Sequence, residues 1–388
     1  MTQPSRREIA FGRPMIAEEE RAAVLRVLES PQLVHGPMAK EFESAFAASL
    51  GGGAYATTVS SCTAGLHLAY LHLGLREGDE VIVPAETHVA TAHTVEVTGA
   101  RPVFVDCEAR TGNIDPAAVA DAITERTRAI SVVHYLGLPV RMEPILSVAR
   151  KHSLFVVEDC ALAVGASLDG VACGLLGDVG AFSFYPVKHI TTAEGGMVVS
   201  RHKEVTASIE NIKAFGYDRT MAERKIPGVY DVARLGINYR MNEIAAAIGV
   251  EQLKKAREFA RRRAENARVL RRQLAEIDEV NVLADGDARA IHANYCIVAV
   301  LEQELAARRP EIMTELRLRG VGTSVYYPVP LPLAKYYKEK YGARPEQFPN
   351  AVRISNHSIA LPVGPHLGTE DMVVIATELK AAIAKCKA

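Results

Sequence analysis

The sequence has no tryptophan, no closely spaced cysteine pair and almost no net charge. A formal net charge of -1 over 388 residues disfavours proteins that bind nucleic acids or other strong polyanions. The six cysteines form no CxxC pair and have no histidine cluster beside them in the sequence. Their pattern disfavours a zinc site and favours reduced thiols in the cytoplasm.

Two further absences concern membranes. The first residues, MTQPSRREIAFGRP, contain no apolar stretch of the kind that a signal peptide needs. No uncharged run approaches the ~18 apolar residues of a membrane-spanning helix. Hydrophobic residues make up 48% of the chain, which is enough for a sizeable core. We therefore expect a cytoplasmic protein with no membrane segment.

Short β-branched runs alternate with helical patterns in the first half of the chain. The runs are Glu80–Ala85, Arg101–Cys107, Arg128–Tyr135 and Leu154–Asp159. Helical patterns between them include Asp115–Glu125 and Met142–His152. This order predicts an α/β fold with a mostly parallel sheet, and strands this apolar are expected to be buried on both faces.

The pattern changes after about residue 200. Asn242–Leu274 reads as one long helix, whose basic second half is interpreted as a solvated face rather than a nucleic-acid patch. The Pro-rich stretch Tyr326–Tyr337 is expected to form an ordered loop. We predict a large α/β domain over residues 1–255, followed over 256–388 by a linking helix and a smaller α+β domain.

Three features are expected to meet at the carboxyl edge of the sheet, where open α/β sheets bind ligands. Small residues open a helix in Val59–Leu75, which fits a phosphate site or an ordinary capped helix. Asp159 ends an apolar strand, where it could cap the next helix or hold a protonated ring nitrogen. Lys188 lies between a strand-like run and Gly195–Gly196, glycines that permit a tight turn. A lysine becomes a nucleophile when burial or nearby cations lower its pKa.

The motifs VSSCTAGLHLA, VVEDCALAVGA, FSFYPVKHITTAEGGMVVS and LGINYRMNEIAAAIGVEQL together resemble one known family. The chain is similar to the DegT/DnrJ/EryC1/StrS aminotransferases, which use pyridoxal 5'-phosphate (PLP) to aminate keto sugars on nucleotide carriers. The resemblance covers nearly the whole chain. It implies the aspartate aminotransferase-like fold (fold type I), with a large, mostly parallel domain and a smaller C-terminal α+β domain.

The resemblance also implies roles for individual residues. Lys188 would carry the internal aldimine and move the proton, and Asp159 would hold the pyridinium. His88 would stack on the cofactor ring, where relatives usually have an aromatic residue. The remaining implied positions would bind the cofactor phosphate, and the last two would reach it from a partner subunit: Thr63, Ala64, Ser183, Asn238 and, as the weaker candidate, Arg240.

These roles imply a ping-pong reaction in a homodimer with shared active sites. L-glutamate would leave its amino group on the cofactor as pyridoxamine 5'-phosphate, which would then aminate a nucleotide-linked keto sugar. The run KHITTAEGG, with HYLGLP upstream, most resembles the branch acting at C4 of 4-keto sugars. Tyr326 and His189 are the residues that we expect near the sugar, His189 chiefly as a packing residue.

Some positions depart from the family. Leu162 stands where relatives commonly have Gln or His near the cofactor's phenolic oxygen, and Tyr326 and Pro332 replace histidines near the sugar. Three alternatives therefore stay open. A sugar dehydratase would use the same cofactor, although such relatives replace the lysine with histidine. A non-catalytic sensor would share the fold. A nicotinamide-binding oxidoreductase lacks support, since no GxGxxG follows an early strand.

Overall fold

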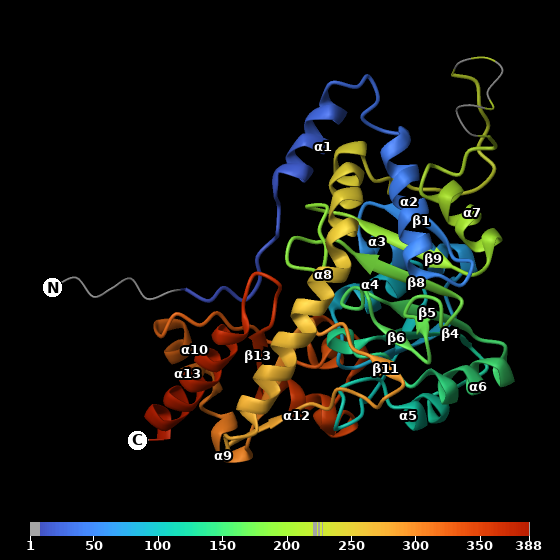
Figure 1. Cartoon of the computed structure of the whole chain (residues 1–388). Coiled ribbons are helices and arrows are strands. Elements are labelled where there is room, and N and C mark those ends of the chain that lie inside the picture. Colours follow the sequence, from blue (N-terminus) through green and yellow to red (C-terminus); the bar gives the residue numbers. More distant parts are fainter. Residues whose placement is uncertain (1–7, 220–222, 224–225, 227, 388) are drawn as a thin grey trace.

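The computed structural model describes residues 8–219, 223, 226 and 228–387. Its centre is a seven-stranded sheet in the order β1-β9-β8-β5-β4-β2-β3 (Figure 1). Only β9 runs against the other strands, because it pairs antiparallel with both β1 and β8. The strands are β1 (Tyr55–Val59), β2 (Glu80–Pro84), β3 (Arg101–Val105), β4 (Thr127–Val133), β5 (Phe155–Asp159), β8 (Val179–Ser183) and β9 (Gly196–Ser200).

Helices cover both faces of this sheet. The two-residue period of β2 shows why: Val81 and Val83 join one buried cluster, whereas Ile82 joins another on the opposite face. One face is covered by α3 (Cys62–Leu73), α4 (Val89–Glu96) and α7 (Lys203–Ile212). The other is covered by α5 (Pro116–Asp121), α6 (Met142–His152) and α2 (Pro37–Leu50). The predicted α/β fold with a mostly parallel sheet is confirmed.

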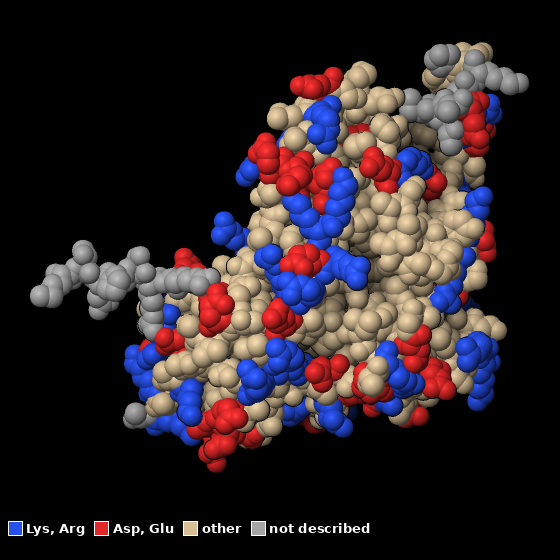
Figure 2. Space-filling model, in the orientation of Figure 1, with Lys and Arg blue, Asp and Glu red and all other residues tan. Residues whose placement is uncertain are grey.

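One continuous helix, α8 (Glu243–Leu274), runs from the large sheet to the C-terminal part (Figure 1). Asn242 caps its start by accepting a hydrogen bond from the Ala245 amide at 2.8 Å. Basic and acidic side chains lie next to each other along its exposed side (Figure 2), including the ion pair between Arg261 and Glu258 at 2.8 Å. This arrangement agrees with the predicted solvated face.

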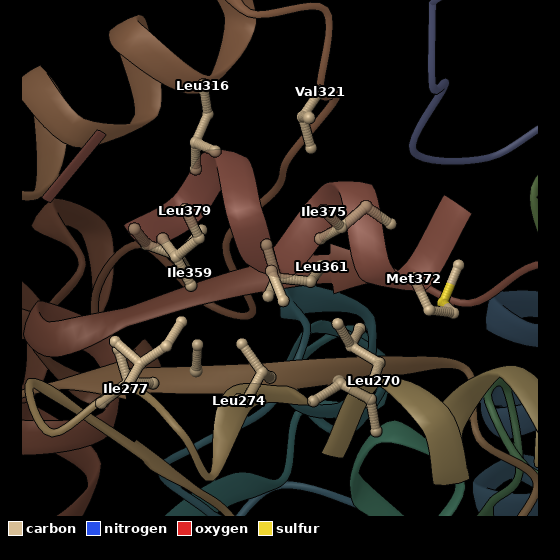
Figure 3. Close-up of a cluster of buried hydrophobic side chains, with 14 of the residues drawn as sticks. Leu270, Leu274, Ile277, Leu316, Val321, Ile359, Leu361, Met372, Ile375 and Leu379 are labelled. Carbon is tan, nitrogen blue, oxygen red and sulfur yellow. The ribbon is translucent and has the colours of Figure 1, made fainter. Parts of the chain in front are cut away.

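The C-terminal part has its own small sheet, in the order β10-β12-β13. Its apolar core joins the end of α8 to the sheet and to α13, as Figure 3 shows for Leu270, Leu361 and Ile375. The elements are β10 (Val280–Val282), β12 (Cys296–Leu301), β13 (Ser358–Pro362), α9 (Gln303–Ala306), α10 (Arg309–Leu318), α11 (Lys335–Tyr341), α12 (Pro349–His357) and α13 (Thr369–Lys387). A third sheet joins β11 (Ala290–Ile291) to β6 (Ser167–Leu168) and β7 (Val171–Ala172).

The N-terminal segment connects to this C-terminal part. Ile9 forms a parallel bridge with Val321 and is buried in the core of the small sheet. The chain then continues to α1 (Glu18–Leu28), which packs along α8. The division into residues 1–255 and 256–388 stays a prediction, and its boundary falls inside α8. In the described part of the chain, every helix is too short or too polar to cross a membrane.

Candidate active site

The carboxyl ends of β5 and β8 bring two of the predicted site residues to one edge of the sheet. These strands pair in parallel, with Asp159 opposite Ala181. Asp159 is the last residue of β5, and Lys188 follows β8 in a loop where its amide donates to the Tyr185 carbonyl at 2.9 Å. An acid and an amine therefore lie at the edge where open α/β sheets bind ligands.

The Lys188 side chain has no hydrogen-bond partner among the residues that the structure describes. Its Nζ lies over the Tyr295 ring, 5.3 Å from the centroid. Burial lowers the pKa of Lys188, although the carboxylate of Asp159 opposes this shift. A lowered pKa leaves more of the amine neutral at neutral pH, and a neutral amine is the nucleophilic form.

Asp159 is 4% exposed and is held by two donors. Its Oδ2 accepts from the Thr91 hydroxyl at 2.8 Å, and its Oδ1 accepts from the Ala161 amide at 3.0 Å. The Cys62 thiol approaches the same carboxylate at 3.9 Å. Two hydrogen bonds leave lone pairs on the carboxylate for a further donor, such as a protonated ring nitrogen.

The start of α3 lies beside this acid, but one of its predicted donors is already used. Ser61 caps the helix by accepting from the Ala64 amide at 3.1 Å, while Thr63 is exposed at the surface. Ser183, at the end of β8, accepts a long hydrogen bond from the Tyr185 amide at 3.5 Å. For Ala64 to bind a phosphate, the ligand would have to replace or share the Ser61 oxygen.

The two glycines after Lys188 serve close packing rather than the tight turn predicted from the sequence. Ala193, not a glycine, has the left-handed backbone there, with φ 68°. A Cβ on Gly196 would come within 2.5 Å of the Ser61 backbone, and one on Gly195 would meet Met241 at the same distance. Gly196 therefore allows the start of α3 to approach β9, which places Thr63 and Ala64 beside the end of β8.

His88 is at the N-cap of α4. Its Nδ1 accepts from the Ala90 amide at 3.2 Å, so the proton of the neutral ring is on Nε2. Burial lowers the pKa of His88 below its usual range, and the positive charge of Lys188 acts in the same direction. His88 as a whole residue is exposed, but its ring is partly shielded and lies 6.0 Å from the Tyr327 ring. A neutral ring can stack on a bound heterocycle. The stacking of His88 on the cofactor ring stays a prediction.

Asn238 and Arg240 flank Tyr239 in the extended segment before α8, and the Tyr239 carbonyl accepts from the Ser60 amide at 2.8 Å, next to the start of α3. Asn238 is exposed and bridges to Ala214. The Arg240 guanidinium lies over the Phe215 ring at 5.2 Å, and its Nε is buried without a hydrogen-bond partner. An exposed amide and an unsatisfied guanidinium nitrogen are both available to a ligand or to another subunit.

Tyr326 and His189, the two residues predicted near the sugar, differ in how accessible their side chains are to a ligand. The Tyr326 hydroxyl bonds to the Tyr295 hydroxyl at 2.9 Å, next to the Lys188 amine. His189 is buried, and its Nε2 donates to the Ala293 carbonyl at 3.1 Å. Burial lowers the pKa of His189 well below its usual range, so the ring is neutral. These contacts favour the packing role for His189.

Sequence reasoning missed an aromatic wall and a buried acid beside the amine. Phe11 stacks on Tyr326 with the centroids 6.0 Å apart, and Tyr295 meets Tyr326 edge-on. Leu162 belongs to the same buried cluster. Glu86, in the stretch PAETHVA, is fully buried behind this wall. A Glu directly after an apolar strand was the signal that could have identified it.

A second buried cluster brings one histidine, His134, next to Glu158 and Cys160. His134 Nε2 donates to Glu158 at 2.8 Å. The same carboxylate accepts from three backbone amides of the loop at 174–177, at 2.6–2.8 Å. These bonds already use the carboxylate, so the cluster serves to anchor the loop, and each of the six cysteines is a free thiol.

Known proteins resemble this chain over almost its full length. Residues 14–380 match the model of the DegT/DnrJ/EryC1/StrS aminotransferase family. GDP-perosamine synthase of Escherichia coli O157:H7 is 36% identical over 369 residues, covering 94% of this chain and 96% of that protein. Spore coat polysaccharide biosynthesis protein SpsC of Bacillus subtilis is 34% identical over 377 residues, with 96% of each chain covered. The PLP form of the putative sugar aminotransferase Spr1654 from Streptococcus pneumoniae has a TM-score of 0.91 at 27% identity, covering 98% of this chain and all of that one.

Proposed function

The chain belongs to the DegT/DnrJ/EryC1/StrS aminotransferase family, a family of PLP-dependent sugar aminotransferases, and from this premise we propose that it moves the amino group of L-glutamate to a nucleotide-linked keto sugar. The observation that carries the proposal is a lysine amine at the same sheet edge as a buried carboxylate; the pKa of this amine is lowered, and it has no hydrogen bond to any described residue. GDP-perosamine synthase, a relative, supports a nucleotide-linked sugar as the substrate class.

The residues at this edge fit PLP. The unbonded Lys188 amine suits the aldehyde, and Asp159 has lone pairs left for the ring nitrogen. Arg240 Nε, buried without a partner, suits a phosphate or a partner subunit. When bound, this cofactor supplies an electron sink that stabilises negative charge on the carbon next to the amino nitrogen.

The chain's own residues would then divide the work. Lys188 would hold the cofactor, move the proton on and off the reacting carbon through its Nζ, and return to the neutral state that burial favours. Asp159 would keep the ring nitrogen protonated. His88 would cover one face of the ring through its neutral imidazole, and Tyr326 would present its hydroxyl to the sugar.

Transfer of isotope-labelled nitrogen tests the reaction. The purified protein with PLP and ¹⁵N-labelled L-glutamate is incubated with a panel of nucleotide-linked keto sugars, 4-keto sugars first. We expect an amino sugar carrying ¹⁵N, together with 2-oxoglutarate. A deoxygenated sugar without nitrogen would identify a dehydratase instead. No sugar product from the panel and no 2-oxoglutarate would favour a non-catalytic sensor.

Homodimer formation is part of the proposal, supported by exposed apolar side chains in the segment that precedes Asn238. Val229, Val232 and Leu235 are 56%, 57% and 79% exposed. Several apolar side chains this exposed in one short segment are typical of a surface that another chain covers. A second copy placed there would bring Asn238 towards the other subunit's cofactor phosphate.

Mixing two inactive variants, Lys188→Ala and Asn238→Ala, is expected to restore activity. If Asn238 acts across the interface, each mixed dimer contains one site with both residues intact. Random exchange makes about half of the dimers mixed, so about a quarter of the wild-type sites are recovered. Transfer activity is measured after denaturing and refolding the mixture. Activity no higher than that of the separate variants would place Asn238 in its own subunit's site or outside the site.

A further inference from the structure

We propose that Glu86 is a neutral carboxylic acid that positions the Tyr326–Tyr327 loop against the turn carrying His88. Glu86 follows β2 in the large sheet, two residues before His88. Tyr326 and Tyr327 belong to the C-terminal part of the chain. The importance of this loop for the sugar rests on the function proposed above, whereas the state of the acid does not.

The carboxyl group joins three separate segments. Its Oε1 accepts from the Tyr327 amide at 2.9 Å, and its Oε2 lies 2.9 Å from the Ser355 hydroxyl at the end of α12. Its Oε1 also lies 3.3 Å from the Tyr135 hydroxyl, which follows β4. Glu86 is 1% exposed, so water does not replace these contacts. The acid therefore connects the turn before α4 to two segments of the C-terminal part.

Counting protons indicates that Glu86 carries one. The Tyr135 hydroxyl has a single proton, and it also makes a short contact with the Tyr326 carbonyl oxygen. A carbonyl oxygen only accepts, so the tyrosine proton points to Tyr326. The contact between Tyr135 and Glu86 is then a hydrogen bond only when the acid supplies the proton.

The charges around Glu86 favour the same state. Burial raises the pKa of Glu86 to about 8, and the carboxylate of Asp106 adds to this effect, while the hydrogen bonds donated by the Tyr327 amide and the Ser355 hydroxyl oppose it. Arg353 on α12 donates to the Ala109 carbonyl, not to Glu86. The titratable groups that act on the acid come from three segments and carry negative or no charge: Asp106, Cys107, Tyr135 and Tyr327. Ionisation would thus leave a buried carboxylate without a cation.

The loop that Glu86 holds is in contact with the proposed catalytic groups. The Tyr327 ring lies 6.0 Å from the His88 ring. Tyr326 is bonded through its hydroxyl to Tyr295, whose ring lies under the Lys188 amine. Ionisation of Glu86 would favour opening of this loop, which would move Tyr326 away from the amine.

Hydrogen exchange at the Tyr327 amide tests the proposal without any substrate. The closed acid keeps its proton up to about pH 8, whereas an open, solvated glutamate loses its proton near the ordinary glutamate pKa of 4.5. Opening therefore releases a proton between these values, and the closed state loses stability as pH rises. After correction for the intrinsic exchange rate, the opening constant of wild type should rise about tenfold per pH unit from pH 5 to 8, and then level off.

Two variants separate the effect of the Glu86 proton from the effect of its hydrogen bond to the Tyr327 amide. Glu86→Gln keeps a neutral side chain with one acceptor and one donor, so its opening constant should stay low and independent of pH. Glu86→Ala removes the acceptor of the Tyr327 amide, so exchange should be fast at every pH. If the opening constant of wild type does not rise with pH, the proposal is overturned. This measurement needs no variant, so it still decides the question if a variant fails to fold. Equal exchange in the Gln and Ala variants also overturns it.

A kinetic arm tests the positioning role with L-glutamate as the probe, because the amino donor would react beside the Lys188 amine, which the Tyr326–Tyr295 pair adjoins. The half-saturating L-glutamate concentration of wild type should rise between pH 7 and 9 relative to that of Glu86→Gln. Parallel pH profiles of the two proteins would overturn the positioning role. If neither protein reacts with L-glutamate, the function proposed above fails, while the exchange experiment still decides the state of Glu86.

Discussion

Replacing Lys188 with alanine is expected to reduce amino-group transfer by about 10³-fold, the scale of a lost acid–base group. The neutral amine favoured by burial is the group that would both bind the cofactor and move the proton. Alanine supplies neither function. A water molecule that enters the space left by the side chain is not held in place over the Tyr295 ring, as the lysine amine is. The measurement is the rate of 2-oxoglutarate release from L-glutamate, together with the visible absorbance of lysine-bound cofactor.

The control is Lys338→Ala, which removes an exposed lysine on α11. This variant should keep the wild-type rate and the absorbance band. Because Lys188 makes no side-chain hydrogen bond within the described residues, its removal should leave the thermal midpoint nearly unchanged. A Lys188→Ala protein that still turns over at the wild-type rate would remove the lysine from the mechanism.

Replacing Asp159 with asparagine is expected to lower the transfer rate by about 10²–10³-fold while the fold survives. Asparagine is the same size and keeps one acceptor for Thr91 or Ala161, so the stability loss should be about 1 kcal/mol. It has no negative charge to keep the ring nitrogen protonated, so the cofactor would be a poorer electron sink. The measurements are single-turnover rates with L-glutamate and unfolding in urea.

Asp178→Asn provides the matched control for that variant. Asp178 precedes β8, at the opposite end of the same strands, and accepts from the Val156 amide at 2.7 Å. Its replacement should cost similar stability but leave the rate unchanged. Equal rates for the Asp159 variant and wild type would show that the acid is only a structural partner of Thr91 and Ala161.

The fold could be predicted because the signals are local. The run Leu154–Asp159 is apolar and β-branched, and it became β5 with a one-residue difference at its start. Met142–His152 was predicted with the bounds that α6 has. The pattern Asp115–Glu125 gave a shorter helix, α5, because the chain leaves the helix after Asp121 to enter β4. These features depend on neighbours in the sequence.

The site was predictable only where it coincides with strand ends. Asp159 and Lys188 follow from the position of β5 and β8, since parallel strands share a carboxyl edge. The role of Gly196 was not predictable, because it depends on the approach of the Ser61 backbone from another segment. Glu86 was missed for the same reason: its partners Tyr327 and Ser355 are far away in the sequence. The remaining roles of the predicted site residues stay predictions.

Reductive trapping identifies directly which lysine binds the cofactor. The protein is incubated with PLP, reduced with borohydride, digested and analysed by mass spectrometry, with Lys188→Ala treated in parallel. We expect one major modified peptide, which contains Lys188 with the added mass of the reduced cofactor, and no such peptide from the variant. A modification at another lysine, or none in a protein that still transfers nitrogen, would contradict the assignment of Lys188.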